Sequence, residues 1–147
     1  FRRVLFRSVN DAEAVKDMLI SKFDFPEKNI RYLVKEEATL SEIKLNLGKV
    51  ATSAGENDRI LVFYSGHGET LKGADESETG YIVPFEGKIE NLYATGLAMD
   101  DILRGHVVMC PATLLIAAVQ AASAQSRQTA SACSMMVTTA SALLSGG

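Results

Sequence analysis

The stretch that decides the fold is DRILVFYSGHGE, residues 58–69. Its central part, residues 59–65, is an almost continuous apolar run, which is typical of a central strand covered on both faces. The run ends at His67, which stands between Gly66 and Gly68. In open parallel sheets, ligands and catalytic groups collect beyond the carboxyl ends of the strands. We therefore expect His67 at a functional edge, with glycines that let the backbone turn sharply and Gly68 offering an unshielded N–H.

The segments before this stretch alternate between helix and strand. Residues 10–23 have an amphipathic period with Asn10 as the expected N-cap, and residues 30–34 have the branched and aromatic composition of a strand. The TLSE sequence at 39–42 is a capping box that opens a second helix. Helix, strand, helix and strand in this order predict an α/β fold, with a mostly parallel sheet flanked by helices.

The segments after His67 are predicted from composition. Residues 66–80 are polar and indicate a long exposed loop of the kind that often carries function. Beyond it we expect a short strand at 81–85 and a short helix at 99–104, followed by buried strands at 112–120 and 135–141.

Size and charge exclude several classes of protein. A chain of 147 residues that is 47% hydrophobic fits one globular domain. The net charge of −3 comes without a basic block, so we expect no nucleic-acid partner, and no apolar run approaches the ~20 residues of a membrane span. The two cysteines, Cys110 and Cys133, form no CxxC motif, which predicts a reducing, cytoplasmic environment. The oligomeric state is not indicated.

The first eight residues, FRRVLFRS, can be translated from the end of a common sequencing adapter. We therefore expect residues 1–8 to be an artefact and residues 9–147 to form a partial domain. The alternative for this segment is an edge strand at RVLF.

Four motifs together resemble one family. VNDAEAVKDML, DRILVFYSGHGE, GYIVPFE and LYATGLAMDDILR, in this order and spacing, are similar to the large-subunit region of bacterial caspase-like proteases, in the peptidase C14 and metacaspase group. The resemblance covers about residues 9–104, and its most specific part is FYSGHG followed by GYIVP. It implies a three-layer caspase-like fold and cysteine endopeptidase activity on a peptide or protein substrate.

The resemblance also implies roles for the residues around the histidine. In the family, the histidine of SGHG pairs with the cysteine of a DACxSG motif, whose thiolate attacks the peptide carbonyl. His67 would then protonate the departing amine, and the Gly68 N–H would help to bind the oxyanion. No cofactor and no metal are implied.

The expected cysteine is not at its place. A spacing of about 50 residues after His67 puts Gln120 at the position of the family's Asp and Ala122 at that of its Cys. Cys133, in SACS, keeps a local similarity to DACxS but lies farther along the chain, whereas Cys110 precedes the strand instead of following it. We name Cys133 as the candidate nucleophile. Metacaspases prefer a basic residue before the cut, which the Asp helps to read, so Gln120 leaves the substrate preference open.

Three accounts of this departure remain open. The source sequence contains an error between residues 105 and 134, or the chain is a non-catalytic caspase-like module that binds partners, or Cys133 is a displaced nucleophile. Metal sites are weaker alternatives. Asp75, Glu76 and Glu78 lack the ligand spacing of a calcium loop, and the two histidines and two cysteines lack the clustered spacing of a zinc site.

Overall fold

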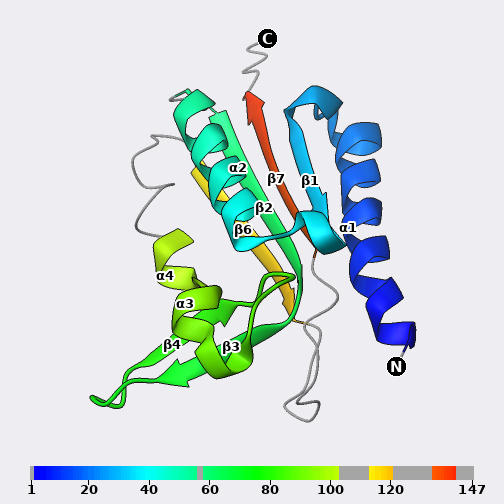
Figure 1. The fold of residues 1–147 in the computed structure, drawn as a ribbon. Coiled ribbons are helices and arrows are strands. Elements are labelled where there is room, and N and C mark those ends of the chain that lie inside the picture. The colour runs from blue at the N-terminus through cyan, green and yellow to red at the C-terminus, as the bar shows by residue number, and fades with distance from the viewer. Residues whose placement is uncertain (1, 56–57, 103–112, 121–133, 142–147) are drawn as a thin grey trace.

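The computed structural model describes residues 2–55, 58–102, 113–120 and 134–141 (Figure 1). Side chains are described from residue 10 to residue 102 within these ranges, and the remaining segments by their backbone. The elements lie in two sheets, a larger one that is flanked by helices and a smaller one beside it.

The larger sheet has four strands in the order β1-β7-β2-β6, namely β1 (Ile30–Val34), β7 (Ser134–Ser141), β2 (Asp58–Gly66) and β6 (Thr113–Gln120). β2 and β6 pair in parallel, as expected for neighbouring core strands. β7 lies between β1 and β2 and runs antiparallel to both. The prediction of a mostly parallel sheet is therefore not confirmed, because the last strand occupies the place between the first two.

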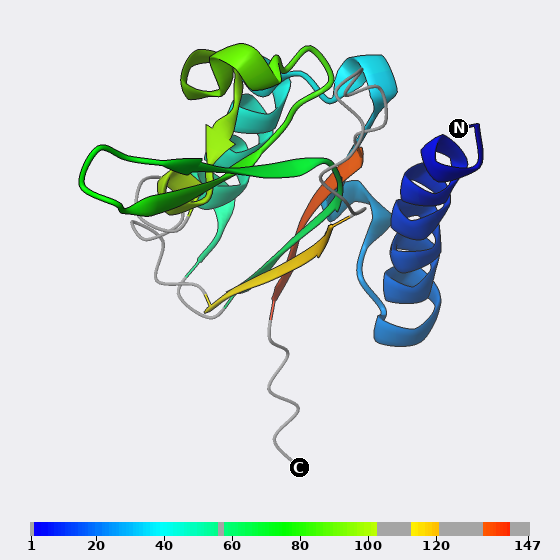
Figure 2. The same cartoon turned by 90° about the horizontal axis from the view of Figure 1, so that it is seen from below.

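Helices cover both faces of this sheet. The side chains of β2 alternate, so that Ile60, Val62 and Tyr64 pack into one apolar cluster with α2 (Leu40–Ser53), while Leu61 and Phe63 pack into another with α1 (Arg2–Phe23). Figure 2 shows the two helices on opposite sides of the strands. A strand buried on both faces reads as a continuous apolar run, which explains the composition of residues 59–65.

The two long helices begin differently from each other. Thr39 caps α2 as predicted, because its hydroxyl accepts a 3.2 Å hydrogen bond from the Glu42 N–H. The prediction of Asn10 as an N-cap is wrong, since α1 already begins at Arg2 and Asn10 lies inside it. The helical backbone of residues 2–9 also rules out the edge strand at RVLF. Among the described residues, no helix has the length and apolarity needed to cross a membrane.

The smaller sheet was not predicted as a sheet, although the strand expected at 81–85 overlaps one of its strands at residues 81–82. Residues 66–80, expected as a loop, instead form most of an antiparallel hairpin of β3 (Gly68–Lys72) and β4 (Glu78–Ile82), and β5 (Leu97–Ala98) pairs with β4. The hairpin is polar because most of it is exposed, and polarity alone does not distinguish an exposed hairpin from a loop. Short helices complete the fold: η1 (Glu27–Asn29), η2 (Lys35–Glu37), η3 (Ile89–Asn91), α3 (Leu92–Thr95) and α4 (Met99–Asp101).

Candidate active site

His67 is the one residue between β2 of the larger sheet and β3 of the smaller sheet. β2 ends at Gly66 and β3 begins at Gly68, so the chain leaves the buried core strand and enters the exposed hairpin at this residue. The carbonyl oxygen of His67 accepts a 2.9 Å hydrogen bond from the Val83 N–H, which follows β4. The backbone of His67 is thus tied to both sheets.

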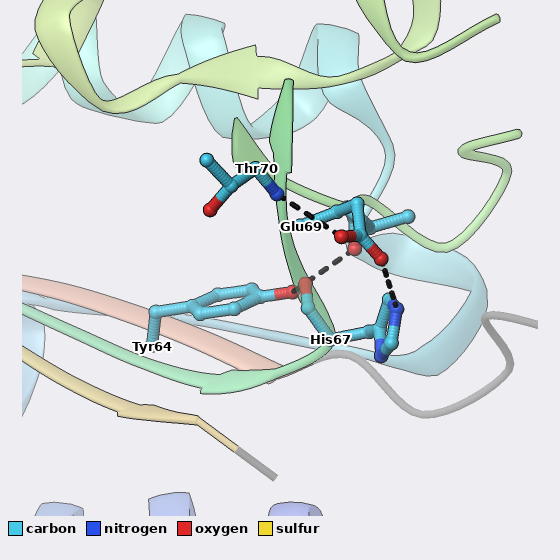
Figure 3. Close-up of polar contacts among 5 residues, drawn as sticks. Tyr64, His67, Glu69 and Thr70 are labelled. Carbon is cyan, nitrogen blue, oxygen red and sulfur yellow. Dashed lines mark hydrogen bonds and ion pairs between the residues drawn. The ribbon is translucent and has the colours of Figure 1, made fainter. Parts of the chain in front are cut away.

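Tyr64 braces this junction from the core. Its ring is buried, and its hydroxyl lies 2.8 Å from the carbonyl oxygen of His67 and 3.0 Å from that of Val83. The single hydroxyl proton is therefore shared between two carbonyls, which brings the ends of β2 and β4 together (Figure 3). Tyr64 fixes where the histidine backbone leaves the sheet.

The position of the Tyr64 ring requires a glycine at residue 66. A Cβ at Gly66 would lie 2.5 Å from the hydroxyl oxygen of Tyr64 and 2.7 Å from its Cζ, since residues 64 and 66 point to the same face of the strand. The expectation that Gly66 permits a sharp turn needs correction, because no glycine in the described part of the chain has a positive φ. The glycine serves close approach of the tyrosine ring, not an unusual backbone conformation.

The His67 side chain faces a carboxylate. Its Nε2 lies 3.8 Å from Oε2 of Glu69, and the other carboxylate oxygen, Oε1, accepts a 3.2 Å hydrogen bond from the Thr70 N–H (Figure 3). Nε2 is a buried atom without a hydrogen-bond partner among the described residues, although the side chain as a whole is 26% exposed. One end of the imidazole is therefore enclosed, with the Glu69 carboxylate beside it.

The carboxyl ends of the core strands meet at His67. Gly66, the residue before the histidine, pairs with Gln120 at the end of β6, and Ser65 pairs with Ser134 at the start of β7. The strand expected at 112–120 is present as β6, and it ends beside the residue that precedes the histidine. Ala122 and Cys133 lie outside the described residues.

The other candidate cysteine also lies outside the described residues. Thr113, three positions after Cys110 in the sequence, pairs with Arg59 near the opposite end of β2. The first residue of β6 therefore lies far from His67, and its last residue lies near His67.

Two residues of this site were missed by sequence reasoning. Tyr64 was counted as one more core residue of the apolar run, and Glu69 as part of a polar loop. A signal for both was present in the period-two alternation, which puts Tyr64 beside Gly66 and His67 beside Glu69 whenever the backbone is extended. The part of the chain with described side chains holds no cluster of three or more His, Cys, Asp or Glu residues suited to a metal ion.

Comparison with known proteins shows the family of the chain. The family model described as the caspase domain of peptidase C14 matches residues 2–141. The chain belongs to this family, and is a cysteine peptidase-like domain.

Curated relatives are metacaspases. The chain is 30% identical to Metacaspase-6 of Arabidopsis thaliana over 73% of its own length and 31% of that protein. It is 31% identical to Metacaspase-2 of the same plant over 68% of its length and 25% of that protein, and 27% identical to Metacaspase-1 of Eremothecium gossypii over 68% and 21%. No solved structure gives a significant match.

The relatives limit what can be said of this chain in two ways. The chain spans less than a third of the length of each of them, so it corresponds to one part of those proteins. They come from a plant and a fungus, so they do not support the bacterial group named from the sequence motifs.

Proposed function

We propose that this chain carries a cysteine endopeptidase site, with His67 as the acid/base, the Gly68 N–H as an oxyanion donor and Cys133 as the nucleophile. The observation that carries the proposal is the position of His67 at the carboxyl ends of β2 and β6, where β7 begins. Catalytic groups gather beyond the carboxyl ends of parallel strands, and β2 and β6 are parallel.

The strand register favours Cys133 over Cys110. Consecutive Cα atoms are about 3.8 Å apart, and Cys133 directly precedes Ser134, which pairs with Ser65. Cys110 lies three positions before Thr113, and three positions of extended chain reach about 11 Å at most. Thr113 pairs with Arg59, and the strand from there to Gly66 is about 23 Å long at roughly 3.3 Å per residue. A cysteine near Ser134 is therefore the better partner for His67.

The chemistry follows from a thiol and an imidazole at this edge. The thiol proton moves to His67, and the thiolate attacks the carbonyl carbon of the peptide bond, whose oxygen becomes an oxyanion. The oxyanion then accepts the hydrogen bond of the Gly68 N–H. His67 returns the proton to the leaving amine, and water hydrolyses the thioester that remains.

A peptide-based thiol-reactive probe tests the proposal. We expect mass spectrometry of the labelled chain to find the adduct at Cys133, with labelling lost in Cys133→Ala, slowed at least about 100-fold in His67→Asn and unchanged in Cys110→Ala. Labelling of Cys110 alone would show that the assignment of Cys133 is wrong. A folded chain that the probe does not label at all would instead be the non-catalytic, partner-binding module.

A further inference from the structure

The side chain of Glu69 lies beside the enclosed end of the His67 ring. The two residues are separated by Gly68 alone and point to the same side of an extended backbone. Their side chains approach to 3.8 Å between Nε2 and Oε2, and the other end of the ring, with Nδ1, points away from Glu69 (Figure 3). We infer that Glu69 is a positioning residue, which holds the neutral His67 ring in the Nε2–H tautomer and so leaves Nδ1 free to accept a proton.

The Glu69 carboxylate is held in place for this role. Its Oε1 accepts the Thr70 N–H at 3.2 Å, which fixes one oxygen against the backbone and leaves Oε2 toward the imidazole. The separation of 3.8 Å is about 1 Å longer than a charge-assisted hydrogen bond, so a small rotation of either side chain completes the contact. Hydrogen bonds of a catalytic histidine often tighten only when substrate is bound.

The histidine backbone is fixed independently of its side chain. The His67 carbonyl accepts hydrogen bonds from the Tyr64 hydroxyl and the Val83 N–H, so the main chain at this position has little freedom. What remains to be set is the rotation of the ring and the nitrogen that carries the proton. A buried Nε2 that faces a carboxylate is stable when it bears hydrogen, because a bare nitrogen there would leave two acceptors facing each other.

The consequence for catalysis rests on the function proposed above. With the hydrogen on Nε2, the lone pair of Nδ1 accepts the thiol proton, and the ring becomes an imidazolium whose positive charge the Glu69 carboxylate balances. The proton on Nδ1 then passes to the leaving amine, while Nε2 keeps its hydrogen throughout. Orientation of a catalytic histidine by a third group is a general requirement of such sites.

The tautomer can be measured without activity. The chain contains two histidines, His67 and His106, so ¹⁵N spectra of the imidazole nitrogens are simple, and a His106→Gln variant assigns them. At alkaline pH we expect His67 of the wild type to be almost entirely the Nε2–H form. In Glu69→Gln, whose amide can donate as well as accept, we expect the ratio of the two forms to return to that of a histidine in a short peptide.

Glu78→Gln is the matched control. Glu78 lies on the same hairpin, and its carboxylate pairs with Lys72 at 3.3 Å instead of with the histidine. The same charge is removed in both variants, so only a specific contact distinguishes them. We expect the His67 tautomer of the Glu78→Gln chain to match that of the wild type.

Probe labelling separates this inference from the proposed function. We expect Glu69→Gln to slow labelling at least about tenfold, a part of the 10²–10⁴ that acid–base catalysis supplies. If no variant is labelled but Glu69→Gln still changes the tautomer, the peptidase proposal is wrong and the assignment of Glu69 stands. A His67 ring that is Nδ1–H in the wild type, or a tautomer ratio that Glu69→Gln leaves unchanged, overturns the inference, whether or not the chain is labelled.

Discussion

The two sheets of this molecule are joined through His67 and differ in how deeply their strands are buried. β2, in the larger sheet, is buried on both faces between α1 and α2, and its residues from Val62 to Gly66 are all buried. β3, in the smaller sheet, has no buried residue. His67 stands between them, with its backbone held by the core and its side chain beside the hairpin. The site therefore combines a rigid support with an accessible surface.

The largest expected effect is on the free energy of unfolding, and it tests the buried packing of the larger sheet. Ile60→Ala removes a side chain that is 1% exposed in the cluster between β2 and α2, and we expect the free energy of unfolding to fall by about 2–5 kcal/mol. Thr70→Ala, on the exposed β3, should change it by less than about 0.5 kcal/mol. Urea denaturation of both variants measures the difference. Equal losses would contradict the contrast between the sheets.

A pair of glycines tests the junction itself. Gly66→Ala places a Cβ within 2.5 Å of the Tyr64 hydroxyl, and we expect the displaced ring to cost about 1–3 kcal/mol and to lower the Tm. Gly48→Ala, inside α2, meets no atom within 4 Å and should stabilise the chain by about 0.5–1 kcal/mol through helix propensity. Calorimetry should show Tm shifts of opposite sign. A Gly66→Ala chain as stable as the wild type would show that Tyr64 can move freely.

Removal of the Tyr64 hydroxyl tests the hydrogen bonds at this junction with a smaller change. Tyr64→Phe keeps the ring but takes away the hydroxyl shared by the carbonyls of His67 and Val83, and we expect a loss of about 1 kcal/mol. The Val83 N–H, which donates to His67, should then exchange faster with solvent in hydrogen-exchange NMR. Tyr93→Phe, at a side chain that is 85% exposed, serves as the control and should change neither quantity.

The smallest effect belongs to the exposed turn of the hairpin. Hydrogen bonds from the Ser77 hydroxyl at 2.6 Å, and then from the Ser77 N–H, hold the pKa of Asp75 below its usual value. A lowered pKa stabilises the turn above the ordinary pKa of aspartate, and this stabilisation is lost as the pH falls through the lowered value. We expect Ser77→Ala to raise the pKa of Asp75, measured by ¹³C NMR titration of the carboxyl group. An unchanged pKa would mean that the hydroxyl contributes nothing.

The strands and helices of the larger sheet were predictable where the sequence pattern involves only neighbouring residues. The strands at 30–34 and 112–120 and the capped helix after Thr39 follow from composition and period, since each depends on residues close together in the sequence. The order of the strands was not predictable in the same way. The insertion of β7 between β1 and β2 depends on pairing between distant segments, which no local pattern records.

In the candidate site too, the residue with a local sequence signal was predicted and the others were not. His67 was found because an apolar strand that ends in a histidine between glycines is visible in a few letters. Tyr64 and Glu69 were missed because their roles depend on which residues face each other after the chain has entered the hairpin. The polar composition of residues 66–80 indicated a loop, and in a loop the alternation that links His67 to Glu69 has no meaning.

The place of β7 also determines when the larger sheet can assemble. Ile30 pairs with Thr138 and Leu61 with the same residue, so both early strands depend on a partner that comes much later in the sequence. Folds dominated by such distant pairings fold slowly, because the entropy of closing long loops must be lost before the contacts form. During synthesis, β1 and β2 therefore emerge long before the strand that joins them. Over that interval their unpaired edges are open to association with other chains.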